Sequence, residues 1–420
     1  MSEDPAKGTL LPMTTALRAP GAPSTLALLR QEPDFRRFLT GYATSLLGSA
    51  MAPVALAFAL LREPGGADAL GWVLTARILP MVLVLLLGGA AADRLGGRRV
   101  MLAADAVRCL AQAGFAAALL TGRPPLWPLL VLAAAGGVGE AVFNPALTAL
   151  IPRLTPPAQL ARANALLTLA RSTASVAGPA AAGVLTAWAG PGTVLALDAA
   201  SYAASLFALA RLTVSTAPHP AGPSLLSELR EGWGEFRSHG WLWAGCLHAC
   251  FLNLVLWAPF LVLGPVCAAH QLGGARGWGL VMGCFGAGSV LGSLGLLRRD
   301  PRRPVLWSTV AMFGFALPPA VLAARTGLPW VCAAAVLAGL GSAVGQSLGG
   351  LALQRLVPER VRARVAAYES LGSFALGPVG LALAGPVAAL LGTGTVLAAG
   401  AVGQLAVTAA VLSLRSVRTN

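Results

Sequence analysis

The sequence predicts an all-α integral membrane protein whose chain crosses a bilayer twelve times and folds into two pseudo-symmetric six-helix bundles. Three observations lead to this prediction. Hydrophobic residues make up 56% of the chain and charged residues only 11%, whereas soluble domains contain about 25% charged residues. Twelve apolar runs each approach or exceed the roughly 20 residues that a spanning helix needs. Basic residues, finally, gather in every second connection between these runs.

The twelve apolar runs follow one another through mostly short connections. Glycine and proline are frequent, with 50 and 30 residues, but membrane helices tolerate both because neighbouring groups satisfy the backbone atoms that they free. We expect spans at about 38–61, 70–92, 100–120, 126–150, 163–189, 191–212, 241–265, 277–297, 305–325, 328–352, 365–389 and 393–414.

The distribution of positive charge predicts the orientation of these spans. Of the 30 Lys and Arg residues, 23 lie in the two terminal segments and in alternate connections, and positive charge marks the cytoplasmic side of short membrane loops. We therefore expect residues 1–37 and 415–420 to be cytoplasmic tails of a multi-pass protein of the plasma (inner) membrane. The net charge of +14 does not indicate nucleic-acid binding, because the arginines are spread over separate loops, where anionic lipid headgroups are their expected partners.

The second half of the chain repeats the first at an offset of about 206 residues. We therefore expect one bundle over 38–212 and a second over 241–414. Parallel repeats of this kind are typical of transporters, which hold their substrate between the halves near the membrane midplane. The matching elements are Gly71-Trp72 with Gly277-Trp278, the basic turn 94–99 with 298–303, Leu150-Ile151-Pro152 with Leu356-Val357-Pro358, and Ala177-Gly178-Pro179 with Ala384-Gly385-Pro386.

Residues 213–240 connect the two halves and have a different composition. A proline-rich stretch precedes Leu225, Leu229, Trp233 and Phe236, which recur at helical spacing with charged residues between them. This pattern predicts an amphipathic helix on the cytoplasmic membrane face. We expect it to tie the halves together; a regulatory role is the alternative.

The short turn after the second span carries a glycine- and arginine-rich motif, 89–99. Its residues Gly89, Asp93, Arg94, Gly96 and Arg98 resemble the signature of the major facilitator superfamily, although Ala91 and Gly97 depart from it. The resemblance covers essentially the whole chain. It implies the twelve-helix fold of that superfamily and a cytoplasmic gate to which Asp93 and Arg98 contribute. The alternative is that the arginines serve only as topological anchors.

A second motif lies in the fifth span. Gly178, Pro179 and Gly183 resemble the end of the antiporter motif of proton-coupled exporters in this superfamily, with Ala182 in place of one glycine. Helix packing through small residues explains the same string. The stretches 143–146, 150–152, 163–166 and 353–360 resemble an exporter branch that includes siderophore, macrolide and other natural-product exporters, without singling out a substrate.

Charged residues within the spans are functional candidates, because ionisable groups at bilayer depth are costly. Glu140 in span four and Arg171 in span five lie at similar depth. We expect Glu140 either to couple proton movement or to be the structural partner of Arg171. Asp198 in span six is a further candidate for proton coupling. Asp105 and Arg108 lie one helical turn apart, so we expect them to pair with each other.

Other polar or aromatic residues in the spans are candidates for lining a substrate cavity: Arg77, Asn253, Trp257, Gln346 and Glu369. Glu369 is in addition a plausible gate partner for the basic turn, at the start of span eleven. His248 with Cys246 and Cys250 does not form a metal site, because the histidine lies on another helix face and a fourth ligand is not evident. We therefore expect no metal and no cofactor.

The favoured functional hypothesis is proton-driven export of a small hydrophobic or amphiphilic compound by a monomer that alternates access between its halves. The chain has no phosphate-binding motif of the type G-x-x-x-x-G-K-[ST], so ATP is not the expected direct energy source. Uptake of a metabolite is the first alternative, although a sugar site would need many more polar groups. A non-transporting membrane sensor or assembly protein is the second. An enzyme is the least favoured, because no nucleophile–base or metal constellation appears.

Overall fold

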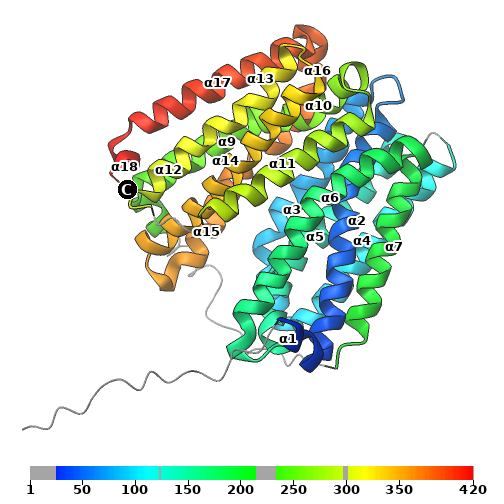
Figure 1. Cartoon of the computed structure of the whole chain (residues 1–420), viewed down its shortest axis with the longest axis vertical. Helices are drawn as coiled ribbons and strands as arrows, with labels where there is room; N and C mark the ends of the chain where they lie inside the picture. The colour runs from blue at the N-terminus through cyan, green and yellow to red at the C-terminus, as the bar shows by residue number, and fades with distance from the viewer. Residues whose placement is uncertain (1–24, 123, 214–232, 297–300, 420) are drawn as a thin grey trace, which may run out of the picture.

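The computed structural model describes residues 25–122, 124–213, 233–296 and 301–419. All the elements within these ranges are helical, and they form two bundles that lean against each other (Figure 1). The predicted all-α fold with two bundles is therefore confirmed.

The N-terminal bundle consists of long, uninterrupted helices. A short helix, α1 (Thr25–Gln31), lies across its end (Figure 1). The spanning helices are α2 (Pro33–Leu60), α3 (Gly66–Leu95), α4 (Gly97–Leu120), α5 (Leu126–Leu154), α6 (Leu160–Ala189) and α7 (Pro191–Ala210), with the 3₁₀ turn η1 (Pro157–Gln159) before α6.

The C-terminal bundle contains three spans that are broken near their middle. Its elements are α9 (Gly240–Leu252), the π-helical η2 (Asn253–Trp257), α10 (Ala258–Gln271), α11 (Ala275–Leu296), α12 (Pro304–Ala311), the 3₁₀ turn η3 (Met312–Ala316), α13 (Leu317–Ala323), α14 (Leu328–Leu356), α15 (Glu359–Phe374), α16 (Gly377–Leu391), α17 (Thr393–Ser413) and α18 (Arg415–Arg418).

Each of the three breaks precedes a proline. In each case the proline lies two residues after the break. Pro259 follows η2, Pro318 follows η3, and Pro378 follows the turn at 375–376. A proline provides no N–H for the carbonyl group four residues earlier, and that carbonyl lies in or beside the break in every case. π-Helical and 3₁₀ segments are common ways to accommodate such a lost hydrogen bond.

Eleven of the predicted twelve spans are long and apolar enough to cross a membrane within the described residues. The exception is α6, which is 30 residues long but carries Arg162 and Arg171 and several hydroxyl residues. It nevertheless packs against α2 of its own bundle and α11 of the other, in the position expected for the fifth span.

The repeat between the halves extends to matching turns. Gly190 joins α6 to α7 and Gly392 joins α16 to α17, each as a single residue with φ near +85° (85° and 86°). Glycine adopts this region without the steric cost that a side chain brings. Both turns precede the last span of their bundle, as a duplicated six-helix unit requires.

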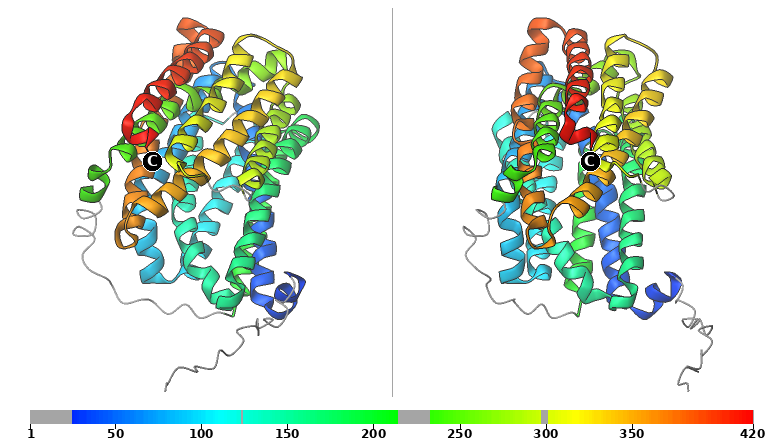
Figure 2. Two further views of the ribbon diagram at one scale, coloured as in Figure 1. Left: turned by 60° about the vertical axis from the view of Figure 1, so that its left-hand side comes forward. Right: turned by 90° about the vertical axis from the view of Figure 1, so that its left-hand side faces the viewer.

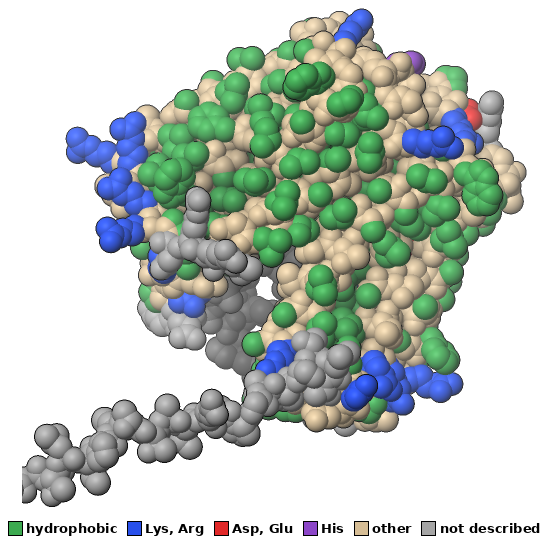
Figure 3. Space-filling model, viewed as in Figure 1, with side chains coloured by type: hydrophobic (Ala, Val, Ile, Leu, Met, Phe, Trp, Pro, Cys, Tyr) green, Lys and Arg blue, Asp and Glu red, His purple; other side chains and the backbone are tan. Residues whose placement is uncertain are grey.

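The two bundles are in contact at one end of the molecule and separate at the other. A large apolar cluster combines residues of both halves, such as Leu70 and Val73 with Phe260 and Leu381. Two further clusters each belong to one bundle alone. The first consists of buried residues from within 28–212, and the second of buried residues from within 236–417. Figure 2 shows the bundles from two further sides, and Figure 3 shows the surface hollowed between them at the end where α1 lies.

Small residues make the closed end possible. Thr75 Oγ1 of α3 donates a hydrogen bond of 3.0 Å to the carbonyl oxygen of Pro378, at the start of α16. A Cβ atom at Gly183 of α6 would lie 2.6 Å from the carbonyl oxygen of Ala275 in α11. Larger side chains here would hold the bundles apart.

The end of the interbundle connection packs on the C-terminal bundle. Residues 233–238 are helical, and Trp233 and Phe236 contact the rings of Trp243 and Tyr368 at centroid distances of 5.1–6.2 Å. Leu225 and Leu229 of the predicted amphipathic helix lie outside the described residues.

Candidate functional site

The glycine- and arginine-rich turn lies between α3 and α4. Gly89, Asp93 and Arg94 belong to the part of α3 whose side chains lie outside the described residues. Gly96 forms the turn itself, with φ of 85°. Arg98 donates hydrogen bonds to the carbonyl oxygens of Leu209 (3.0 Å) and Ala210 (2.8 Å), at the end of α7. In this conformation Arg98 therefore caps a helix of its own bundle.

The motif in α6 lies at the closed end of the interface. Gly178 packs against Ala50 of α2, whereas Gly183 faces Ala275 and Gly279 of α11. The carbonyl oxygen of Pro179 faces Gly279. Close packing accounts for Gly178, Pro179 and Gly183 in this conformation.

An ion pair joins α3 to α5 inside the N-terminal bundle. Arg77 donates to Glu140 Oε2 through both Nε (3.2 Å) and Nη2 (2.9 Å). The side chain of Arg77 is 26% exposed and that of Glu140 is 37% exposed, although protein surrounds both on most sides. A position on the wall of a concave space fits both observations.

The predicted pairing of Glu140 with Arg171 is wrong. Arg171 lies in α6 and donates through Nε to the hydroxyl of Tyr42, at 2.8 Å. Similar depth from one membrane face does not fix which side of a helix a residue occupies, and Arg77 lies on the side of α3 that α5 covers.

The predicted pairing of Asp105 with Arg108 is confirmed. Both lie on α4, and Arg108 Nη2 contacts Asp105 Oδ1. Ser205 of α7 donates a hydrogen bond of 2.6 Å to the other carboxylate oxygen. The Arg108 guanidinium also lies 4.0 Å from the ring centroid of Phe143 and 4.6 Å from that of Tyr202. Three different helices thus hold this arginine in place.

We expect the Asp105→Ala variant to be destabilised by about 3–5 kcal/mol, because it leaves the Arg108 charge buried without its partner. Ser205→Ala removes a single hydrogen bond to a charged group and should cost about 1.5–3 kcal/mol. Thermal unfolding in detergent micelles measures both. Equal losses for the two variants would show that Arg108 does not depend on Asp105.

Asp198 is a third carboxyl group of the bundle interior, and it is fully buried (0% exposed). Gln112 Nε2 of α4 donates to its Oδ2, and Ser201 Oγ approaches its Oδ1 at 3.4 Å. The charges of Arg77 and Arg108 act on this carboxyl group from a distance, but among the described residues neither arginine donates a hydrogen bond to it. Asp198 is therefore a buried acid without a cation in contact.

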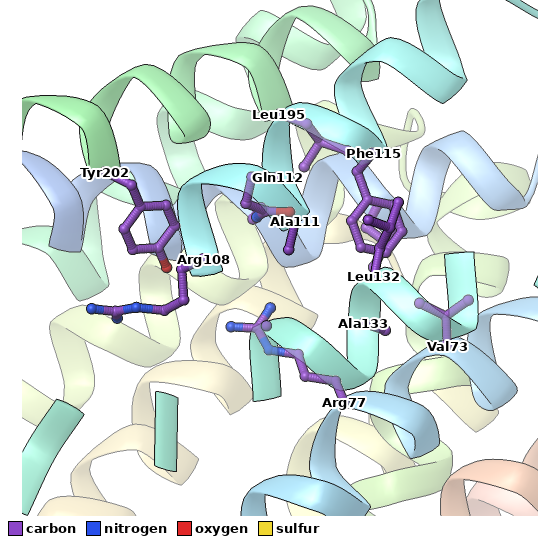
Figure 4. Close-up of a pocket in the computed structure, with 13 residues that line it drawn as sticks. Val73, Arg77, Arg108, Ala111, Gln112, Phe115, Leu132, Ala133, Leu195 and Tyr202 are labelled. Atoms are coloured by element: carbon purple, nitrogen blue, oxygen red, sulfur yellow. The ribbon is translucent and has the colours of Figure 1, made fainter. Parts of the chain in front are cut away.

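A small cavity lies between these groups. It has a volume of about 30 Å³, and its polar lining consists of Arg77, Arg108, Gln112 and Tyr202. Figure 4 shows the Arg77 guanidinium pointing into this space toward Gln112 and Arg108. A cavity of this size holds a water molecule when polar groups surround it.

Gln112, Tyr202, Ser201 and Ser205 did not emerge from the sequence as site residues. A signal was present, because Asp198, Ser201 and Ser205 recur at helical spacing in one span and Asp105, Arg108 and Gln112 do so in another. Two polar stripes at this spacing indicate helices that face each other, as α4 and α7 do.

Aromatic side chains cluster around Trp257 in the C-terminal bundle. Trp257 contacts Phe260, Phe285 and Phe315 at ring-centroid distances of 5.3–5.6 Å. Asn253 Nδ2 donates to the carbonyl oxygens of Ala249 (2.9 Å) and Ser373 (3.1 Å), so it stabilises the irregular backbone at η2.

Gln346 and Glu369 remain candidates for the cavity wall. Gln346 is exposed on α14 and donates to Ser342 Oγ at 3.0 Å. Glu369 is half-buried on α15, and the sulfur of Cys246 approaches its backbone oxygen at 4.0 Å.

His248 belongs to a buried cluster with Thr408 and Gln404 of α17. Its Nε2 lies 3.0 Å from Thr408 Oγ1 and 2.9 Å from Gln404 Nε2. In the described part of the chain, no three His, Cys, Asp or Glu residues are grouped in a way that could hold a metal ion.

Comparison with known proteins agrees with the arrangement of two helical bundles. The family model of the Major Facilitator Superfamily matches residues 38–299, well over half of the chain. The chain belongs to this superfamily. It is accordingly a membrane transporter and not an enzyme.

Named relatives include two efflux proteins. This superfamily member is 28% identical over 366 residues to the multidrug efflux pump Tap of Mycobacterium tuberculosis, covering 83% of this chain and 86% of that pump. It is 24% identical over 300 residues to macrolide efflux protein A of Streptococcus pyogenes, covering 70% and 74% of the two chains.

Solved structures share the fold at low sequence identity. A bacterial homologue of the iron transporter ferroportin, in an inward-facing state, superposes with a TM-score of 0.69 at 17% identity, covering 91% of this chain and 99% of the other. The nucleoside transporter NupG superposes with a TM-score of 0.73 at 14% identity, with coverage of 91% and 99%. These likenesses concern the fold alone.

Proposed function

We propose that this transporter exports small hydrophobic or amphiphilic compounds, including drugs, in exchange for protons. The similarity to a multidrug efflux pump and a macrolide efflux protein over most of the chain supports export. Inward movement of a proton would supply about 2.3 kcal/mol per 100 mV of membrane potential.

The observation that carries proton coupling is the set of carboxyl groups in the N-terminal bundle. Glu140 is bound to Arg77 and accessible, whereas Asp198 is fully buried and, in the described part of the chain, has no cation in contact. Ionisable groups at this depth cost free energy, so they are rare in membrane spans and usually mark a functional site. Arg171, bound to Tyr42, takes no part in this proposal.

The two bundle walls suit an amphiphilic substrate. Arg77 and Glu140 offer charge on one side, while the half-buried rings of Trp257 and Phe285 offer apolar contacts on the other. Gln346 and Glu369 add the few polar contacts that fix orientation in a mostly apolar pocket, whereas Asn253 is buried and bound to backbone carbonyl groups.

The separated end of the bundles corresponds to the cytoplasmic face in this proposal. Helices α1 and α18, which adjoin the predicted tails, lie toward that end (Figure 1). In this proposal both termini are on the cytoplasmic side of the plasma membrane, as the distribution of positive charge predicts. The conformation is then inward-facing, and Gly89, Asp93, Arg94 and Arg98 would form the closed gate in the opposite state. We further propose that 213–240 links a bundle at 38–212 to one at 241–414, and that a monomer is sufficient for transport.

Inverted membrane vesicles from a host without its own drug pumps test the proposed function. Erythromycin, ethidium and tetracycline would be added while a fluorescent dye reports the proton gradient. We expect at least one compound to accumulate in the vesicles and to dissipate the gradient, with both effects abolished by a protonophore. Vesicles without the transporter are the control.

Two results would contradict the proposal. Intact cells that accumulate more compound when the protein is expressed would indicate uptake. Vesicle accumulation that persists with a protonophore would indicate another energy source.

A further inference from the structure

The middle of the N-terminal bundle contains more carboxyl groups than guanidinium groups to pair with them. Among the described residues in the middle of this bundle, Asp105, Glu140 and Asp198 are acidic, whereas Arg77 and Arg108 are the cations near them. Asp105 holds Arg108 and Glu140 holds Arg77. Asp198 is the remaining acid, and Arg77 is within electrostatic reach of it.

Arg108 has more partners than Arg77, and its side chain is more deeply buried. The Arg108 side chain is almost fully buried, bound to Asp105, and packed on the rings of Phe143 and Tyr202. The Arg77 side chain is 26% exposed, and among the described residues its side-chain hydrogen bonds all go to Glu140. If Glu140 is neutralised, Arg77 loses that partner while Arg108 keeps its own.

The cavity of about 30 Å³ gives Arg77 a place to move. Arg77 lies on one side of it and Gln112, which binds Asp198, on another. A rotation of the Arg77 side chain across this space would bring its guanidinium toward the carboxyl group of Asp198. Rotamer changes of this kind need no movement of the backbone.

The surroundings of Asp198 favour a single cation as its partner. On α7, Ser201 and Tyr202 are near it. On α4 these are Gln112, Cys109 and Arg108, with Asp105 bound to Arg108. On α3, Arg77 is near it, and on α5, Glu140 lies beyond Arg77. On α2, Gly48 leaves the space that the Asp198 carboxyl group fills. Of these groups, Arg77 and Arg108 are the cations, and Arg77 is the one whose acid partner, Glu140, is partly exposed.

We propose that Arg77 is a switch between Glu140 and Asp198, and that a cationic amphiphile which binds Glu140 thereby releases a proton from Asp198. In the first state of the proposed switch, Glu140 is bound to Arg77, as in the structure, and Asp198 carries a proton. The substrate ammonium group replaces Arg77 at Glu140, Arg77 pairs with Asp198, and the O–H bond of Asp198 breaks. The proton leaves to water in the cavity. The total charge is the same before and after, with one substrate cation bound for one proton released.

This switch deepens the proposed function, because it would explain how one substrate is exchanged for one proton. Its test, however, needs no transport. Infrared spectroscopy of the purified protein in detergent detects the carbonyl stretch of a protonated carboxyl group, and this band shifts in heavy water. The difference between each variant and the same variant with Asp198→Asn isolates the contribution of Asp198.

At neutral pH we expect the Asp198 band in the wild type, its loss in Glu140→Gln, and its return in the double variant Arg77→Gln/Glu140→Gln. Glu140→Gln imitates a neutralised Glu140, and removal of Arg77 takes away the cation that would displace the proton. The control is Glu369→Gln in the other bundle, which should leave the band unchanged.

A band that persists in Glu140→Gln, or that is absent from the wild type, would overturn the switch. If Asp198→Asn does not fold, the heavy-water-sensitive band is compared directly between wild type, Glu140→Gln and the double variant. The expected pattern of bands without proton-linked export in vesicles would refute the proposed function and leave the switch standing. Proton-linked export without this pattern of bands would refute the switch and leave the proposed function standing.

Discussion

Glu140→Gln and Arg77→Gln are each expected to reduce proton-driven export by about 10- to 100-fold, and the double variant is expected to lose no more. Each single change leaves one member of the α3–α5 ion pair without its partner. A lost hydrogen bond to a charged group costs about 1.5–3 kcal/mol, and each 1.4 kcal/mol corresponds to a factor of ten. The larger cost of fully buried pairs does not apply, because both side chains are partly exposed.

Initial rates of export in vesicles measure these effects, with protein amounts matched by immunoblot. Arg171→Gln is the control, because Arg171 lies at similar depth but binds Tyr42 instead of Glu140. We expect this variant, at matched protein amounts, to export at close to the wild-type rate, because the Arg171–Tyr42 hydrogen bond takes no part in the proposed coupling. A loss as large as that of Arg77→Gln, or additive losses in the double variant, would contradict a functional pair.

Gly279→Val is expected to open the closed end of the interface and to lower transport by about 10- to 100-fold. A Cβ atom at Gly279 of α11 would overlap the carbonyl oxygen of Pro179 in α6. Overpacking of this kind costs about 1–3 kcal/mol, and the molecule avoids the cost by separating the bundles at this end. The equilibrium then shifts toward the conformation in which this end is open.

Labelling of one cysteine measures the shift. Thr75→Cys, at the α3–α16 contact, is introduced after the six native cysteines have been replaced. Gly279→Val should accelerate its reaction with a maleimide that does not cross membranes, added from the outer side. Gly295→Val is the matched control on the same helix, because a Cβ atom there meets no neighbour within 4 Å. Similar acceleration by both variants would refute the explanation from packing.

The fold was predictable because bilayer crossing leaves a strong mark on a sequence. Long apolar runs and alternating arginines specify the spans and their order, and the structure has helices at all twelve positions. Within one helix, spacing also predicted a contact correctly, since Asp105 and Arg108 at i and i+3 face the same direction.

Contacts between helices were harder to predict. The sequence indicates the depth of Glu140, Arg77 and Arg171, but not the rotation of each helix about its axis or the choice of neighbour. For this reason Arg171 was assigned to Glu140, while Arg77 binds it in the structure. Gln112 was missed for a related reason, because a neutral amide stands out less than a charge even though it contacts Asp198.

The three proline-associated breaks have a consequence for how the duplicated halves have diverged. All lie in the C-terminal half, at η2, at η3 and at 375–376, whereas the buried carboxyl groups discussed above lie in the unbroken N-terminal half. In the proposed function, the N-terminal copy of the repeat would supply an unbroken frame for ion chemistry, and the C-terminal copy would supply joints. Chimaeras should reflect this division: exchanging the C-terminal half with that of a relative would alter compound selectivity, while the ion stoichiometry would follow the N-terminal half.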